Sequence, residues 1–183
     1  MPLSPQDAAA ALSDIAQAER RSATLYNYRQ GSPHLILWGV LWAAGYGLTF
    51  LWPAYAQTIW AIVVPAGIAG GFVIFRMART GAQHSSGWRY GAIAAILFMY
   101  FFATFFVMAP VSGRQVGAFV PLFVAAAYGM GSLWLGPRYA FAGAAVAALT
   151  LAGFVFLGAY FPLWMAGVGG GALILAGFWL RRV

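Results

Sequence analysis

Long apolar segments alternate with short breaks over most of this chain. Six segments each hold about 20 mainly apolar residues, the length that a helix needs to cross a hydrocarbon core of roughly 30 Å. They lie near residues 34–52, 56–75, 90–109, 116–135, 139–158 and 161–180, and glycine or proline stands in the breaks between them. The pattern predicts an all-α integral membrane protein, with a six-span helical bundle over residues 32–183.

Residues 1–31 are more polar and rich in alanine, and they predict a separate cytoplasmic amphipathic helix. Gly31 followed by Pro33 is expected to stop this helix before the first span. Two interpretations compete for it. The helix either lies on the membrane surface, with its arginines near lipid phosphates, or docks a protein partner. We favour the surface interpretation, because the formal charge of residues 1–31 is zero and their apolar face is narrow.

The composition places the chain in the membrane class, with 63% hydrophobic and 7% charged residues and a mean hydropathy of +0.80. The chain contains no cysteine, which excludes disulfides and thiolate chemistry. All its basic residues other than histidine are arginine, and with the abundant alanine and glycine this indicates a GC-rich bacterial genome.

The arginines divide unequally between the two sides of the predicted membrane. With the N-terminus inside, only Arg114 lies outside, and the inside carries Arg20, Arg21, Arg29, Arg76, Arg79, Arg89, Arg138, Arg181 and Arg182. This positive-inside bias predicts a multi-pass protein of the bacterial inner membrane with both termini in the cytoplasm. We expect these arginines to set topology and contact lipid headgroups. They form no basic stripe of the kind that binds nucleic acid.

Acidic residues are absent from residues 30–182, and the three in the chain are Asp7, Asp14 and Glu19. The apolar region therefore lacks the carboxylates used for acid and base catalysis, for metal binding and for proton coupling. Ser132 has no histidine or lysine after it in the sequence to act as its base. His34 and His84 are interpreted as solvated surface histidines. We expect no enzymatic activity, no cofactor and no metal site.

Two blocks of sequence recur at the same offset. AAGYGLTFLW at 43–52 matches AAAYGMGSLW at 125–134, and IAGGFVIF at 68–75 matches TLAGFVFL at 150–157. The offset relates the first span to the fourth and the second to the fifth. A three-span unit repeated once enters the membrane from opposite sides, so the match predicts a 3+3 inverted-topology repeat. A rival match, VPLF at 120–123 with FPLW at 161–164, would instead indicate three two-span hairpins.

The repeat directs attention to Tyr46 and Tyr128, which are equivalent in it and could face a shared cavity. Pro65 lies mid-span beside glycines and is expected to kink its helix or mark a hinge. Small residues four apart allow close helix packing in lipid, within one chain or in a homo-oligomer. The pairs considered for that role are Gly67 with Gly71 and Gly167 with Gly171.

These observations favour a polytopic inner-membrane protein that is a non-enzymatic structural, sensory or partner-binding module. Its expected partners are membrane lipids and, through the N-terminal helix, a protein. The alternative is a small-molecule or lipid transporter that uses the inverted repeat without carboxylate-based proton coupling.

Overall fold

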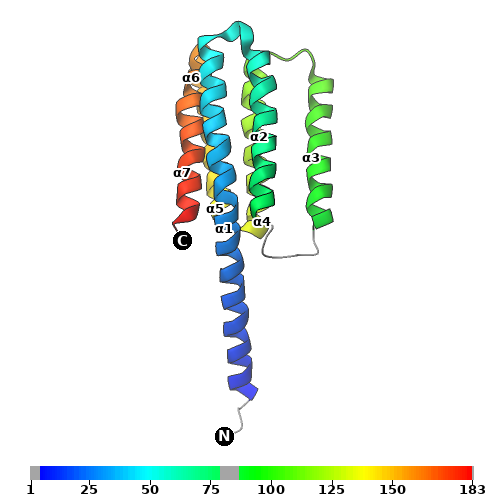
Figure 1. Ribbon diagram of the computed structural model, residues 1–183, viewed down its shortest axis with the longest axis vertical. Helices are drawn as coiled ribbons and strands as arrows, with labels where there is room; N and C mark the ends of the chain where they lie inside the picture. Colours follow the sequence, from blue (N-terminus) through cyan, green and yellow to red (C-terminus); the bar gives the residue numbers. More distant parts are fainter. Residues whose placement is uncertain (1–4, 79–86, 183) are drawn as a thin grey trace.

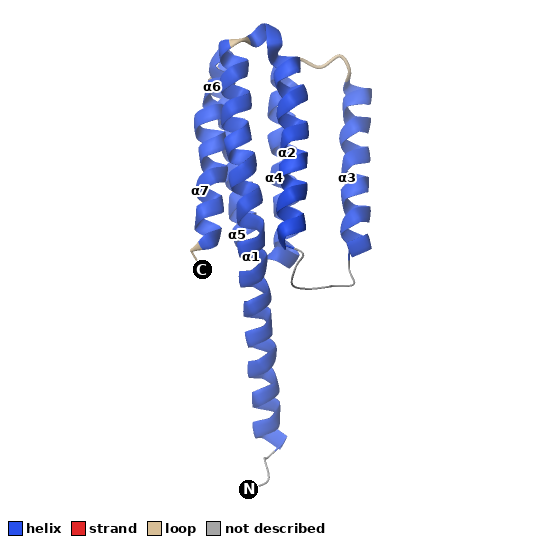
Figure 2. Cartoon of the chain, in the orientation of Figure 1, coloured by secondary structure: helices blue, strands red, loops and turns tan. Residues whose placement is uncertain are grey.

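Helices account for nearly all of the described chain. The computed structural model describes residues 5–78 and 87–182, and no strand occurs in these two ranges. Figure 1 labels α1 to α7, and Figure 2 shows the same view coloured by secondary structure. The helices are α1 (Pro5–Leu51), α2 (Ala56–Ala78), α3 (Gly87–Met108), α4 (Gly113–Leu135), α5 (Arg138–Phe156), α6 (Phe161–Trp164) and α7 (Gly170–Arg181). Two 3-10 turns, η1 (Pro53–Tyr55) and η2 (Gly158–Tyr160), precede α2 and α6, and a π-helical turn, η3 (Met165–Gly169), joins α6 to α7.

Within the described residues, five stretches of helix are long and apolar enough to cross a membrane. They correspond to the predicted spans 1, 2, 4, 5 and 6. The remaining predicted span corresponds to α3, of which the fully described part, Ala95–Met108, is apolar. The all-helical prediction is thus confirmed for the described residues, and the length and composition of the helices indicate a membrane-embedded protein.

The predicted helix stop at Gly31–Pro33 is wrong. α1 is a single helix of 47 residues with Pro33 inside it, which at about 1.5 Å per residue is about 70 Å long. Tyr28, Ser32 and Leu35 are all buried, and they lie on one side of α1 across the predicted break. Packing on that side holds the helix together where proline removes one backbone donor. The first half of α1 therefore projects beyond the bundle as a rod (Figure 1).

Glycines bring α1 and α7 into close contact. A Cβ on Gly39 would lie 2.9 Å from the Gly170 carbonyl oxygen, and one on Gly177 would lie 3.1 Å from the Ser32 carbonyl oxygen. α4 and α5 meet in the same way, because a Cβ on Gly143 would lie 2.7 Å from the Ala125 carbonyl oxygen. None of these glycines belongs to the pairs that were predicted for helix packing, although their small size is what permits backbone contact in a membrane bundle.

α3 stands at the edge of the bundle (Figures 1 and 2). It meets α4 through stacked and edge-on aromatic rings, with Phe101 5.9 Å from Phe119 and 5.4 Å from Phe123 between ring centroids. Most of its other large side chains are exposed, including Phe102 and Phe106. Aromatic pairs, rather than close backbone contact, attach this helix.

Candidate functional site at the arginine-rich end of the bundle

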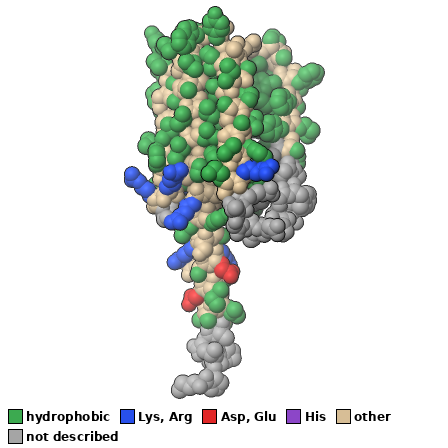
Figure 3. Space-filling model, viewed as in Figure 1, with side chains coloured by type: hydrophobic (Ala, Val, Ile, Leu, Met, Phe, Trp, Pro, Cys, Tyr) green, Lys and Arg blue, Asp and Glu red, His purple; other side chains and the backbone are tan. Residues whose placement is uncertain are grey.

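Arginine side chains gather where the bundle meets the projecting part of α1, as Figure 3 shows. Arg76 lies in the last turn of α2, Arg138 begins α5 and Arg181 ends α7, whereas Arg114 lies in the first turn of α4 at the opposite end. Arg20 and Arg21 lie on the exposed part of α1, and Arg182 follows α7. Arg79 and the side chain of Arg89 lie outside the described residues. The charge separation expected from the sequence therefore corresponds to two ends of one bundle.

Two of these arginines also join helices, a role that the sequence analysis missed. The Arg138 guanidinium donates to the Trp179 carbonyl oxygen at 2.8 Å and lies 4.7 Å from the centre of that indole. Its other neighbour is the Tyr28 ring, at 5.3 Å. Cation–π contacts of this kind and a charge-assisted hydrogen bond connect α1, α5 and α7. No spacing in the sequence predicts these contacts, because they cross three helices.

Ser32 forms a second connection between α1 and α7. It is fully buried, its hydroxyl donates to the Gly177 carbonyl oxygen at 2.7 Å, and the hydroxyl oxygen accepts from Arg181 Nε at 2.8 Å. One hydroxyl thus satisfies a carbonyl and a guanidinium at once. This contact lies beside Pro33, within the segment where a helix end was expected.

Gly31 provides space for a third connection. The Tyr139 hydroxyl donates to the Asn27 carbonyl oxygen at 3.2 Å, and a Cβ on Gly31 would overlap that hydroxyl. The glycine is needed for the approach of a tyrosine from α5, and it does not end the helix.

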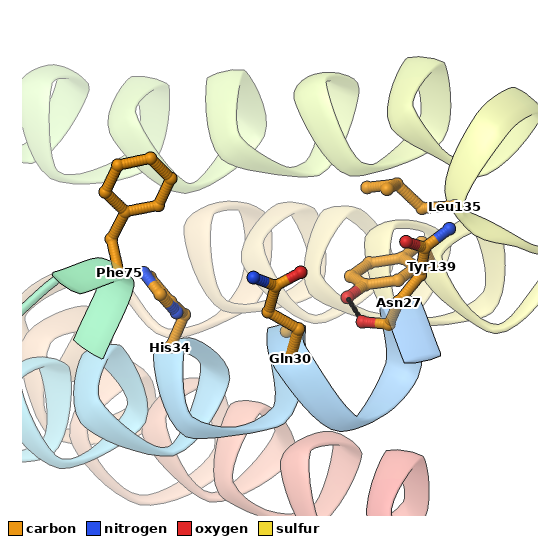
Figure 4. Close-up of a pocket in the computed structure, with 7 residues that line it drawn as sticks. Asn27, Gln30, His34, Phe75, Leu135 and Tyr139 are labelled. Carbon is orange, nitrogen blue, oxygen red and sulfur yellow. Dashed lines mark hydrogen bonds between the residues drawn. The ribbon is translucent and has the colours of Figure 1, made fainter. Parts of the chain in front are cut away.

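A groove of about 230 Å³ opens beside this junction. We call it the interfacial groove; it is lined by Asn27, Gln30, Gly31, His34, Phe75, Leu135 and Tyr139. Figure 4 shows Gln30 between His34 and Asn27 along α1, with Phe75 coming from α2 and Leu135 from the end of α4. His34 is half-buried, with its ring 3.7 Å from a Cβ placed on Gly71, so it is not fully solvated. His84 lies outside the described residues.

The structure does not bring Tyr46 and Tyr128 together. The Tyr46 hydroxyl donates to the Gly117 carbonyl oxygen at 2.6 Å, near the start of α4. Tyr128 lies eleven residues further along that helix, about 16 Å at 1.5 Å per residue, and its ring packs 6.1 Å from Tyr139. Pro65 is exposed on α2, which continues across it. A shared cavity of these three residues has no support in this arrangement.

The two glycine pairs differ in their surroundings. A Cβ on Gly67 would lie 2.5 Å from the Trp38 indole, so this glycine accommodates a ring from α1. Gly71 is close to His34, as described above. Gly167 and Gly171 have no atom within 4 Å of an added Cβ among the described residues. These two glycines therefore make no close helix contact within the described chain, and a role between two copies stays a prediction.

Comparison with protein-family models, with curated proteins and with solved structures gave no match. Within the described ranges, no group of three or more His, Cys, Asp or Glu side chains is placed to hold a metal ion.

Proposed function

We propose that this chain is a non-enzymatic membrane module that binds a cytoplasmic protein through the projecting part of α1, residues 5–26, which we call the arm. The observation that carries the proposal is the continuity of α1 through Pro33. A helix lying on the membrane surface would have to bend sharply where α1 enters the bundle. Contacts of Tyr139 with Asn27 and of Arg181 with Ser32 oppose that bend from two sides. The structure thus favours the docking interpretation over the surface interpretation.

The arm also presents apolar side chains that nothing in the described chain covers. Leu12 is 68% exposed, Ile15 56% and Tyr26 49%, and the three lie on one side of the helix. A partner helix or groove would remove these side chains from water, as in other helix-in-groove complexes. Glu19 lies in line with Ile15 and Tyr26 on this side of the helix and would supply one charge within the contact, whereas Asp14 and Arg20 lie on other sides.

The test is affinity purification of the full chain in lipid nanodiscs with two double variants of the arm. Leu12→Gln with Ile15→Gln alters the apolar face, and Ala10→Gln with Ser13→Gln places the same side chains on the opposite face. We expect a stoichiometric protein partner that is lost only with the first pair. Equal recovery with both pairs, or a retained small molecule without a protein partner, would contradict the proposal and favour transport.

The proposed orientation puts both termini in the cytoplasm of a bacterial inner membrane, in agreement with the positive-inside rule. The chain has no cysteine, so single cysteines report accessibility without background. Ser13→Cys on the arm should react with a membrane-impermeant maleimide only in inverted vesicles, and Gln57→Cys at the start of α2 only in intact cells. Exchange of the two patterns would reverse the orientation.

The inverted repeat is retained as a hypothesis. Its support is that α1 packs on α2 as α4 packs on α5, and that Tyr46 and Tyr128 lie at different depths, as an axis in the membrane plane requires. α1 also packs along α7 through glycines, whereas its counterpart α4 meets α3 through aromatic rings. No observation favours transport specifically.

A further inference from the structure

We propose that the interfacial groove binds the hydroxyl-rich sugar headgroup of a membrane lipid. The proposal rests on the side chains that line the groove and on its position, and it does not depend on the arm binding a protein.

Three polar side chains converge on the groove from one side of α1. Asn27, Gln30 and His34 are spaced by three and four residues, which places them in line on the helix surface. Each is half-buried, and none of the three side chains has a hydrogen-bond partner among the residues that the structure describes. Half-buried polar groups without protein partners, converging on a concave site, are typical of binding sites.

The chemistry of these groups matches hydroxyls. Carboxamides donate and accept, and a neutral imidazole does both through its two nitrogens. A sugar hydroxyl also donates and accepts, so neighbouring hydroxyls can pair with successive side chains along α1. The Phe75 ring, next to His34 in Figure 4, adds an apolar wall of the kind that surrounds the few polar groups of a ligand site.

The described lining carries no arginine, which argues against a phosphate as the main group recognised. Arg138 and Arg181 are engaged with Trp179 and Ser32, and Arg76 lies 4.8 Å from the Phe72 ring centre on α2. Arginines at this end attract anionic lipids in general. Recognition inside the groove would instead use neutral hydrogen bonds.

Position and size indicate a lipid as the source of the hydroxyls. The groove lies at the arginine-rich end, and on the same side of α2 as Phe75 the apolar surface continues to Ile68, which is 55% exposed. Acyl chains can lie along such a surface while the headgroup enters the groove. Its volume of about 230 Å³ is below the roughly 300–1,000 Å³ of sites for drug-sized ligands, which suits a headgroup.

The experiment uses the full chain in phosphatidylcholine nanodiscs that contain either monoglucosyldiacylglycerol or diacylglycerol. Both added lipids are uncharged, so general attraction to arginine does not separate them. Native mass spectrometry of the released protein measures how much of each lipid is retained. We expect retention of the glucolipid but not of diacylglycerol, and about tenfold weaker retention by Gln30→Leu, the change expected for one lost hydrogen bond at about 1.4 kcal/mol.

Gln57→Leu is the matched control, because it makes the same change at an exposed position near the opposite end of α2. It should retain the glucolipid like the wild type. Thermal unfolding checks that each variant folds, and His34→Leu replaces Gln30→Leu if the latter does not. Equal retention of both lipids, or equal retention by the groove variant and Gln57→Leu, would overturn the proposal. If methyl glucoside displaced the bound glucolipid when the two were present at equal concentrations, the groove would bind sugar hydroxyls without needing a lipid. That result would support the hydroxyl site but overturn its assignment to a lipid.

Discussion

Replacing Gly31 with alanine tests whether this glycine makes room for Tyr139 or ends a helix. In an open helix interior, Gly→Ala stabilises by about 0.5–1 kcal/mol, since it reduces backbone entropy in the unfolded state. At Gly31 the new Cβ would overlap the Tyr139 hydroxyl and lie 2.9 Å from the ring carbon that bears it. The ring must therefore shift, and its bond to the Asn27 carbonyl oxygen must lengthen or break.

The expected size follows from these two effects. Overpacking costs about 1–3 kcal/mol, and loss of a hydrogen bond between membrane helices averages about 0.6 kcal/mol. Set against the helix-propensity gain, Gly31→Ala should lower the free energy of unfolding by about 0.6–3 kcal/mol. In a Tyr139→Phe background the overlapping oxygen is absent and only the 2.9 Å contact with the ring carbon remains, so the same substitution should cost much less.

The assay is reversible unfolding in mixed detergent micelles, followed by the fluorescence of the native tryptophans. The wild type, both single variants and the double variant form one thermodynamic cycle. Gly129→Ala is the matched control, because it lies within α4 with no atom within 4 Å of an added Cβ in the described structure, and it should be stabilising. An equal loss of stability from Gly31→Ala with and without the Tyr139 hydroxyl would refute the reasoning and would indicate that the backbone at Gly31 requires glycine.

Three further predictions concern the bundle. Gly39→Ala should lower the unfolding temperature markedly, because its Cβ would lie 2.9 Å from the Gly170 carbonyl oxygen and backbone cannot move aside easily. Gly167→Ala has open space around its Cβ and should leave the unfolding temperature unchanged. Equal effects of the two substitutions in thermal scans would contradict the α1–α7 contact. Tyr46→Phe removes only the donor to the Gly117 carbonyl oxygen and should lower the free energy of unfolding by about 0.6–1.7 kcal/mol in the detergent assay; an unchanged value would show that this bond is not stabilising. Tags on the two termini should be digested by protease from the same face of sealed vesicles, and digestion from opposite faces would exclude an even number of crossings.

The arginine-rich end shows which features could be predicted from sequence. Positions of Arg138 and Arg181 at span ends were predictable, because apolar segments need charged ends in a bilayer. Their partners were not, because Trp179 and Ser32 belong to other segments and pairing depends on which helices are neighbours. Asn27, Gln30 and His34 already lay in line on one helix face, but a stop was expected between Gln30 and His34, so their common groove was missed.

Span lengths, helical class and the placement of charge follow directly from the order of residues. Every segment that crosses the hydrocarbon core must match its thickness and keep charged groups out of it. Whether Gly31 and Pro33 would end α1 depended on a local preference of a few kcal/mol, which burial of Tyr28, Ser32 and Leu35 against neighbouring helices opposes. Only packing between distant segments could decide that competition, and with it the direction of the arm, the groove at its base and the separation of Tyr46 from Tyr128.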